Sequence, residues 1–220
     1  MKPLVSCVMP TKDRRRFIPA AIDCWRRQTY QKRELIILDD GKDSIRDLVP
    51  RDRRIRYLYD PNLKVTMGLK RNLINSMAKG ELICHFDDDD WSADNRIEMQ
   101  VELLWKSKMP VTGFNRMIFW NCVKQEAYFY RAFVAGYVCG TSLCYETDLW
   151  KSYQFKDKQV ASDHDYVTGI LKKIKVCPDY SFLVARIHDG HTSDKAGINN
   201  PINKNSIPMR FWENEKLRVA

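Results

Sequence analysis

Three apolar runs in the N-terminal part of the chain each stop at a polar cluster, and this feature limits the fold more than any other. The runs cover residues 4–9, 34–38 and 81–86, and helix-compatible segments separate them. Short β-branched runs that alternate with helices are typical of a mainly parallel α/β sheet. Ligands bind at the carboxyl ends of the strands in such sheets, so the clusters predict one site at one sheet edge.

The remaining elements follow from the same periodicity. We expect helices over residues 15–29, 69–78 and 94–107 and a further strand over 55–59. Gly80 is expected to cap the second of these helices at its C-terminal end. After residue 110 the chain is more aromatic, and it predicts strands within 111–130, 137–145 and 182–188 and a helix past Asp165.

Four consecutive aspartates, residues 87–90, follow the apolar run 81–86. Like charges at this spacing repel one another, so each carboxylate raises the pKa of its neighbours. A bound divalent cation removes the cost of this repulsion. Carboxylate oxygens suit Mg²⁺ or Mn²⁺, and these ions also bridge phosphates. A solvated acidic turn beside the helix that starts near Asp94 is the alternative interpretation. From these residues alone, both interpretations stand.

Two common nucleotide-binding motifs are missing from the sequence. It has no G-x-x-x-x-G-K-[ST] loop, and no G-x-G-x-x-G follows the first apolar run. Both a P-loop enzyme and a dinucleotide enzyme are therefore disfavoured. A nucleotide would have to be held by carboxylates, a metal ion and a few basic groups.

Four segments together resemble a family 2 glycosyltransferase of the GT-A fold, and the resemblance covers roughly residues 3–190. VSCVMPT, residues 5–11, resembles the first strand and nucleotide-contacting loop of that family. ELIILDDG, residues 34–41, resembles its second strand and the carboxylate that holds uracil. GLKRN with AKGELI, starting at residues 68 and 78, is similar to its G-x-x-x-x-N…A-x-G-E stretch. FDDDDW, starting at residue 86, looks like its D-x-D segment.

The resemblance implies an architecture and a domain organisation. We expect a GT-A fold, with a Rossmann-like nucleotide-binding half on a mainly parallel sheet and a smaller acceptor-binding part. The nucleotide-sugar-binding part would span residues 1–110, and the acceptor-binding and catalytic part 111–196. Residues 197–220 would form a C-terminal extension.

The resemblance also implies the residues of a donor site and a metal site. Mn²⁺ or Mg²⁺ is expected on Asp87, Asp89 and His188, with His191 as the second choice for the histidine. The ion would neutralise charge on the leaving diphosphate of a UDP-sugar. The expected donor-binding residues are Thr11, Asp39, Asp40, Lys70, Arg71, Asp87 and Asp88.

A general base is expected at Asp163, which matches the aspartate of the family's E-D pair, although Ser162 replaces the usual glutamate. Asp165 is the alternative base, and an N-cap of the following helix is the structural alternative for Asp163. His164 could support the base from beside it. His85 lies inside a predicted strand and is expected to be packed. The implied reaction is an inverting displacement by a metal-dependent hexosyltransferase.

The acceptor stays open between two classes of molecule. A bacterial surface glycan or a lipid-linked sugar fits many members of the family. DNA carrying a hydroxymethylated pyrimidine, as some phage enzymes modify, fits the net charge of +9 and the arginine clusters at residues 14–16, 26–27 and 51–56. A nucleic-acid-binding module without catalysis is the non-enzyme alternative, and ordinary solubility also accounts for the charge.

The N-terminus lacks the order of regions found in a signal peptide, and no apolar stretch reaches the length of a membrane span. The seven cysteines are odd in number, form no C-x-x-C pair and sit mostly in apolar runs, which is typical of reduced, buried thiols. We therefore expect a cytoplasmic protein with no stable membrane anchor.

Overall fold

The N-terminal apolar runs form the centre of a seven-stranded sheet in the computed structural model, which describes residues 1–190, 198 and 200–218. Strand β1 (Val5–Thr11) pairs in parallel with β2 (Arg33–Asp39) and with β4 (Leu82–His85), and β3 (Ile55–Tyr59) pairs in parallel with β2. Every residue of β1, β2 and β4 is buried, as expected for strands covered on both faces.

Three strands from later in the chain complete this sheet beyond β4. Strand β9 (Cys144–Glu146) runs antiparallel to β4 and to β6 (Val111–Gly113), and β10 (Ile174–Val176) pairs in parallel with β6. The order is β10-β6-β9-β4-β1-β2-β3. Parallel pairs outnumber antiparallel ones, which confirms the expected mainly parallel α/β sheet.

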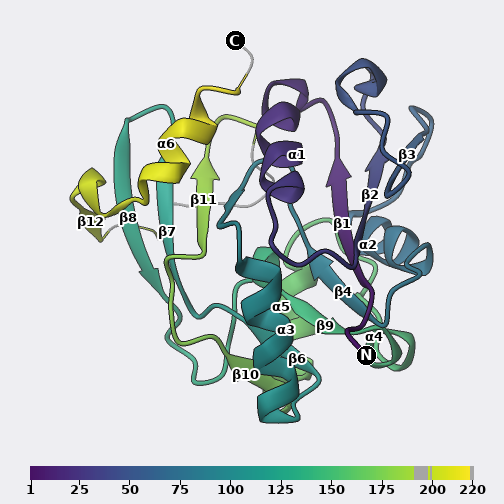
Figure 1. Ribbon diagram of the computed structural model, residues 1–220, viewed down its shortest axis with the longest axis vertical. Coiled ribbons are helices and arrows are strands. Elements are labelled where there is room, and N and C mark those ends of the chain that lie inside the picture. Colours follow the sequence, from purple (N-terminus) through teal and green to yellow (C-terminus); the bar gives the residue numbers. More distant parts are fainter. Residues whose placement is uncertain (191–197, 199, 219–220) are drawn as a thin grey trace.

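Helices cover both faces of the sheet (Figure 1). They are α1 (Ile18–Arg26), α2 (Met67–Ser76), α3 (Arg96–Ser107), α4 (Thr147–Ser152), α5 (Ser162–Gly169) and α6 (Met209–Glu215). Alternate residues of β1 point to opposite sides, so Cys7 packs with α1 and α3 while Val8 packs with α2, α4 and α5. No helix among the described residues is both long and apolar enough to cross a bilayer. Short 3₁₀ turns lie at Arg15–Phe17, Arg46–Leu48, Gly140–Ser142, Leu171–Lys173 and Lys204–Ser206.

A second, five-stranded sheet stands beside the first (Figure 1). Its order is β12 (Pro201–Ile202), β8 (Glu126–Arg131), β7 (Arg116–Asn121), β11 (Leu183–Ile187) and β5 (Trp91–Ser92). Strand β5 comes from before residue 110, whereas β6, β9 and β10 of the first sheet come from after it. A division of the chain at residue 110 therefore runs through both sheets.

The C-terminal segment packs into the core. Phe211 of α6 is fully buried, and its ring centroid lies 6.4 Å from those of both Trp91 and Trp120. Asn214 Nδ2 donates a hydrogen bond of 2.9 Å to the carbonyl oxygen of Ala20 in α1. Residues 209–215 are thus joined to the N-terminal half of the chain.

Two local expectations were wrong. The apolar segment 137–145 forms a strand only from Cys144 onward, because residues 140–142 make a 3₁₀ turn. Gly80 does not cap a helix: α2 ends at Ser76, and a Cβ atom on Gly80 would lie 2.5 Å from the Leu4 carbonyl oxygen and 2.8 Å from the Ser6 nitrogen. Glycine is needed there because two backbones approach closely.

Candidate functional site

Two cavities lie at the sheet edge where β1, β2 and β4 end. The smaller has a volume of about 170 Å³, and Thr11, Asp40 and Asp88 reach it from the three strand ends. The larger, about 680 Å³, is lined by the aspartates 87–90 and by residues of the second sheet. The structure therefore brings the three polar clusters together at one edge. Five residues, Pro10, Arg14, Met67, Asp88 and Gln159, line both cavities.

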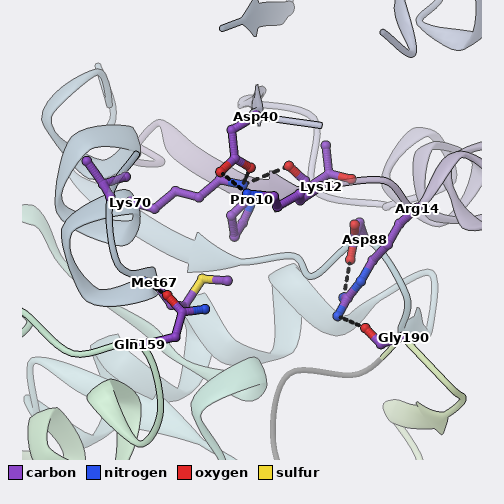
Figure 2. Close-up of a pocket in the computed structure, with 11 residues that line it drawn as sticks. Pro10, Lys12, Arg14, Asp40, Met67, Lys70, Asp88, Gln159 and Gly190 are labelled. Atoms are coloured by element: carbon purple, nitrogen blue, oxygen red, sulfur yellow. Dashed lines mark hydrogen bonds and ion pairs between the residues drawn. The ribbon is translucent and has the colours of Figure 1, made fainter. Parts of the chain in front are cut away.

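Lys70 organises the wall of the smaller cavity (Figure 2). Its ammonium group donates to the Thr11 carbonyl oxygen at 2.7 Å and forms a buried ion pair with Asp40. Lys12 Nζ lies 3.4 Å from the other carboxylate oxygen of Asp40. Burial lowers the pKa of Lys70, while the ion pair with Asp40 opposes that shift. Three of the expected donor-binding residues, Thr11, Asp40 and Lys70, are thus joined by direct contacts.

Asp39 has a different setting from its neighbour Asp40. Its carboxylate accepts hydrogen bonds from the Gly41 nitrogen at 2.9 Å and from the Tyr57 hydroxyl at 2.7 Å. Asp39 is buried and is not among the residues that line either cavity. Its contacts order the turn after β2, so Asp40 is the better placed of the two for a nucleotide.

Arg14 lies within the acidic cluster, although the sequence predicts a basic surface for this arginine. Its Nη1 atom is 2.9 Å from Asp88 Oδ1 and 2.7 Å from Asp89 Oδ2, and Nη2 donates to the Gly190 carbonyl oxygen at 2.8 Å (Figure 2). Burial raises the pKa of Asp88 to about 7, although the Arg14 charge opposes the shift. The guanidinium group therefore supplies the countercharge for two adjacent carboxylates.

His188, which directly follows β11, contacts the Asp89 carboxylate as well. Its Nε2 lies 3.0 Å from Asp89 Oδ2, and its Nδ1 accepts a hydrogen bond of 3.1 Å from the Gly190 nitrogen. The second bond places the proton of the neutral ring on Nε2, which then donates to Asp89. Although burial raises the pKa of Asp89, His188 and Arg14 together hold it below the ordinary value. His191, the second choice, lies outside the described residues.

Asp90 has a structural setting. Its Oδ1 accepts from the Arg186 backbone nitrogen at 3.1 Å, and Oδ2 accepts from the Thr141 hydroxyl. Arg186 also donates from Nη1 to the Asp89 carbonyl oxygen at 2.9 Å. These bonds fix the loop after β4 against the second sheet, and they leave Asp87, Asp88 and Asp89 as the carboxylates available to a ligand.

The donor chemistry of this cluster suits a hard divalent cation. Asp87 Oδ1 and Asp88 Oδ2 are buried and have no hydrogen-bond partner within the described part of the chain. Such oxygens are costly unless a ligand or ion pairs with them. In the same part of the chain, no three histidine, cysteine, aspartate or glutamate side chains already converge as a formed metal site. The residues fit a cation, but their side chains have to rearrange to hold it.

Asp163 faces the larger cavity from the first turn of α5. It is not an N-cap: Ala161 occupies that position, and no side chain caps the helix. Asp165 is instead paired with Lys158 at 2.6 Å and Lys156 at 3.7 Å, and it is not among the residues that line the cavity. Of the two candidate bases, only Asp163 reaches the space beside the acidic cluster.

Gly140 makes room for Asp163. A Cβ atom at this glycine would lie 2.2 Å from Asp163 Oδ2 and 2.7 Å from its Cγ. If Asp163 is a catalytic base, Gly140→Ala should displace its carboxylate and lower turnover by about 100-fold, because misplacement of a catalytic group by about 1 Å has an effect of that size. Steady-state kinetics would measure the loss, and thermal unfolding would show whether the fold is retained.

The Asp163→Asn background provides the control for Gly140→Ala. If the glycine acts through Asp163, the second substitution should lower turnover little further, because the two effects share one cause. A further full loss of turnover in that background would show that Gly140 acts elsewhere.

A buried network connects this glycine to the acidic cluster. Arg71 Nη1 lies 3.7 Å from Asp87 Oδ1 and 2.8 Å from His85 Nδ1, and the same ring nitrogen is 2.8 Å from the Gly140 carbonyl oxygen. His85 Nε2 lies 3.0 Å from the Tyr145 hydroxyl. His85 is fully buried, as expected, and burial together with the Arg71 charge lowers its pKa.

The acidic cluster predicts how stability depends on pH. Burial raises the pKa of both Asp88 and Asp90 to about 7, so these groups bind more protons in the folded chain than in the unfolded one below that pH. The contribution of these two carboxyls to stability should therefore fall as the pH rises from about 4 to about 7. In chelator we expect the Tm of the wild-type protein, measured by calorimetry, to fall more steeply over this range than that of a variant that lacks one of them.

Asp88→Asn should flatten this pH dependence, whereas Asp148→Asn, at an exposed position, should leave it unchanged. An identical slope in the Asp88→Asn variant would mean that the buried carboxyl does not titrate as described.

The aromatic residues after position 110 divide into two groups. Phe119, Tyr130 and Tyr137 line the larger cavity, as the aspartates do. Trp120 instead packs against Trp212, with ring centroids 4.9 Å apart. His164 lines the cavity beside Asp163, and its Nδ1 lies 3.3 Å from the Tyr137 hydroxyl.

The chain is similar to glycosyltransferases in sequence. The sequence model for glycosyl transferase family 2 matches residues 6–154. WfgD of Escherichia coli, a UDP-Glc:α-D-GlcNAc-diphosphoundecaprenol β-1,3-glucosyltransferase, is 34% identical over 109 residues, which cover 48% of this chain and 43% of WfgD. Glycosyltransferase GlyG of Streptococcus pneumoniae is 29% identical over 151 residues, which cover 66% of this chain and 47% of GlyG. The chain therefore spans about half the length of these relatives.

Solved structures show the same fold. TarS of S. aureus, in complex with UDP, superposes with a TM-score of 0.69 at 17% identity, over 84% of this chain and 60% of TarS. A mannosyltransferase of Pyrobaculum calidifontis, in complex with GDP-Man and Mn²⁺, superposes with a TM-score of 0.66 at 15% identity, over 90% and 59% of the two chains. The architecture is thus the GT-A fold expected from the sequence, and the match over residues 6–154 shows that this chain belongs to glycosyl transferase family 2.

Proposed function

We propose that the protein transfers a sugar from a UDP-sugar to an acceptor hydroxyl with inversion at the anomeric carbon. One observation carries the proposal: Asp163 and the aspartates 87–90 line the same cavity of about 680 Å³. A donor diphosphate at the aspartates and an acceptor beside Asp163 could then meet in one space. Such positioning of two reactants is a main source of enzymatic rate enhancement.

Asp163 is the proposed general base. Its carboxylate takes the proton of the acceptor hydroxyl as that oxygen forms a bond to the anomeric carbon. The bond between this carbon and the diphosphate oxygen breaks in the same displacement, and the electron pair leaves with UDP. Arg71, which lines the cavity next to Asp87, is placed to stabilise the negative charge that develops there.

The nucleotide is proposed to bind in and beside the smaller cavity, where Thr11, Asp40, Lys70 and Asp88 meet. Asp39 would act there mainly by ordering the turn that carries Asp40. UDP is the favoured nucleotide, in keeping with the UDP bound to TarS and the UDP-Glc donor of WfgD.

A divalent ion, Mn²⁺ or Mg²⁺, is proposed to bind at Asp87 and Asp89, with His188 as the third ligand. Bound there, it would neutralise charge on the leaving diphosphate. The buried oxygens Asp87 Oδ1 and Asp88 Oδ2, which have no hydrogen-bond partner in the described part of the chain, support this part of the proposal. For His188 to serve as a ligand through Nε2, its proton has to move to Nδ1, and the Gly190 N–H that now faces Nδ1 has to turn away.

The proposed acceptor is a surface glycan or a lipid-linked sugar. The aromatic side chains of Phe119, Tyr130 and Tyr137 offer faces on which sugar rings can stack. The relative WfgD acts on a diphosphoundecaprenol-linked sugar, which supports the lipid-linked class.

The structure weakens the basis for a DNA acceptor, because many arginines of the three basic clusters pair with carboxylates of the protein itself. Arg15 pairs with Asp47, and Arg27 pairs with Asp23 and Asp94. Arg54 and Arg56 pair with Asp52 and Glu34, and Arg14 lies in the site. Charge that is already neutralised contributes less to binding phosphates.

Radiolabelled UDP-sugars offered with three acceptors would test the proposal: a lipid-linked glycan extract, hydroxymethylcytosine DNA and unmodified duplex DNA. We expect label only in the extract, in the presence of Mn²⁺, and no label with the Asp163→Asn protein. Label in hydroxymethylcytosine DNA alone would contradict the proposed acceptor, and UDP binding that is as tight in chelator as in Mn²⁺ would contradict the proposed metal.

A further inference from the structure

Arg14 belongs to both halves of the proposed site. It follows β1 in the sequence, and its side chain lines the smaller cavity as well as the larger one. Its guanidinium group contacts Asp88, Asp89 and the Gly190 carbonyl oxygen, and its side chain is 17% exposed. The group therefore sits at the boundary between the two cavities and has open space on either side.

The contact with Asp89 decides what else can bind there. Arg14 Nη1 and His188 Nε2 approach the same atom, Asp89 Oδ2, at 2.7 and 3.0 Å. A divalent cation held by His188 Nε2 and by the Asp89 oxygen nearest to it would lie on that same atom, Asp89 Oδ2. Arg14 and the cation therefore compete for one position, because two positive charges cannot occupy it together.

We propose that Arg14 is a built-in counter-cation that a divalent metal ion exchanges with when the donor binds. In the protein without ligands it neutralises Asp88 and Asp89. When the ion takes these carboxylates, the guanidinium group turns into the smaller cavity and pairs with the diphosphate of the nucleotide. This inference rests on the proposed function, since it requires a divalent ion and a nucleoside diphosphate at this edge of the sheet.

The exchange couples the two ligands. If the ion bound alone, it would leave a largely buried guanidinium group without its carboxylates, which is costly. A diphosphate removes that cost, because arginine binds phosphate oxygens through paired, charge-assisted hydrogen bonds. The nucleotide should therefore raise the affinity for the ion, and the ion should raise the affinity for the nucleotide by the same factor.

The test measures Mn²⁺ binding by calorimetry and electron paramagnetic resonance, with and without UDP, and needs no turnover. In the wild-type protein we expect UDP to tighten Mn²⁺ binding at least about tenfold. In Arg14→Gln, Mn²⁺ alone should bind about tenfold more tightly than in the wild type, and UDP should add little. Arg14→Lys keeps the charge but lacks the planar fork that pairs with a diphosphate through two parallel hydrogen bonds. Its Mn²⁺ affinity and its response to UDP should therefore lie between those of the wild type and Arg14→Gln.

Arg15→Gln is the matched control. It removes the same charge one residue away, from a side chain that pairs with Asp47 outside the cavities, and should change neither affinity. Circular dichroism would confirm that each variant is folded.

Three results would overturn the proposal in distinguishable ways. If Arg14→Gln bound Mn²⁺ more tightly than the wild type by the same factor with and without UDP, the substitution would act by a general charge effect. That result would exclude the exchange. Unchanged Mn²⁺ affinity in that variant would exclude competition. A wild-type protein that binds no Mn²⁺ under either condition would contradict the metal part of the proposed function, and the exchange with it.

Discussion

Asp163→Asn should reduce sugar transfer by about a thousandfold and leave UDP affinity within about twofold of the wild-type value. Asparagine keeps the size and polarity of the side chain but cannot accept the acceptor's proton. The base acts only in the chemical step, so the loss should appear in kcat. Initial rates with saturating donor, together with calorimetric titration of UDP, measure the two quantities separately.

Asp165→Asn is the matched control, since it changes the same residue type within the same helix. Its carboxylate pairs with Lys158 rather than facing the cavity, so turnover should stay close to that of the wild type. If Asp163→Asn kept wild-type turnover and Asp165→Asn lost most of it, Asp165 would be the base and Asp163 would not.

Asp89→Asn should instead weaken the binding of UDP with Mn²⁺ by roughly 10- to 100-fold, the size expected for loss of a charged partner. Its carboxylate is the shared partner of Arg14 and His188, and it is one of the proposed ligands of the ion. The neutral amide would remove the anion that the two neighbours share, although Arg14 would keep its contact with Asp88. Turnover should fall as well, and titration of UDP in Mn²⁺ and in chelator measures the binding part.

Asp148→Asn removes an equal charge from the surface in α4 and should change neither UDP affinity nor turnover. If Asp89→Asn lost turnover while UDP affinity in Mn²⁺ stayed that of the wild type, Asp89 would act in catalysis but not in donor binding.

The sequence predicts much of the fold because the evidence for β1, β2 and β4 is local. Each strand is a short apolar run that ends in residues unsuited to a buried strand, and a parallel sheet places those ends at one edge. The convergence of Thr11, Asp40 and Asp88 on one cavity follows from this rule without further information.

The contacts that complete the site depend on residues far apart in the sequence, which local patterns do not record. Arg14 meets Asp88 across 74 positions and Gly190 across 176. In the sequence Arg14 reads as one of three consecutive arginines of a basic surface. Its place four residues after Pro10, in the loop that follows the first strand, was the one available signal that it could face a ligand.

The role of Gly80 was misjudged, and that of Gly140 was not predicted, for a related reason. Gly80 and Gly140 are both required by a close neighbour, the β1 backbone in one case and the Asp163 side chain in the other. Sequence rules assign glycine to turns and helix ends because those uses are local, whereas a close approach depends on tertiary packing.

The attachment of α6 has a consequence for how such a protein can vary. Asn214 and Glu215 hold the guanidinium group of Arg186 at 3.2 and 2.8 Å, and the backbone nitrogen of that arginine holds Asp90. A substitution at Asn214 or Glu215 would therefore alter the contacts that hold the acidic loop, although neither side chain touches a substrate. Among relatives, we expect Asn214 and Glu215 to change no faster than the loop of residues 87–90. A comparison of evolutionary rates along α6 with the rate of that loop would test this expectation.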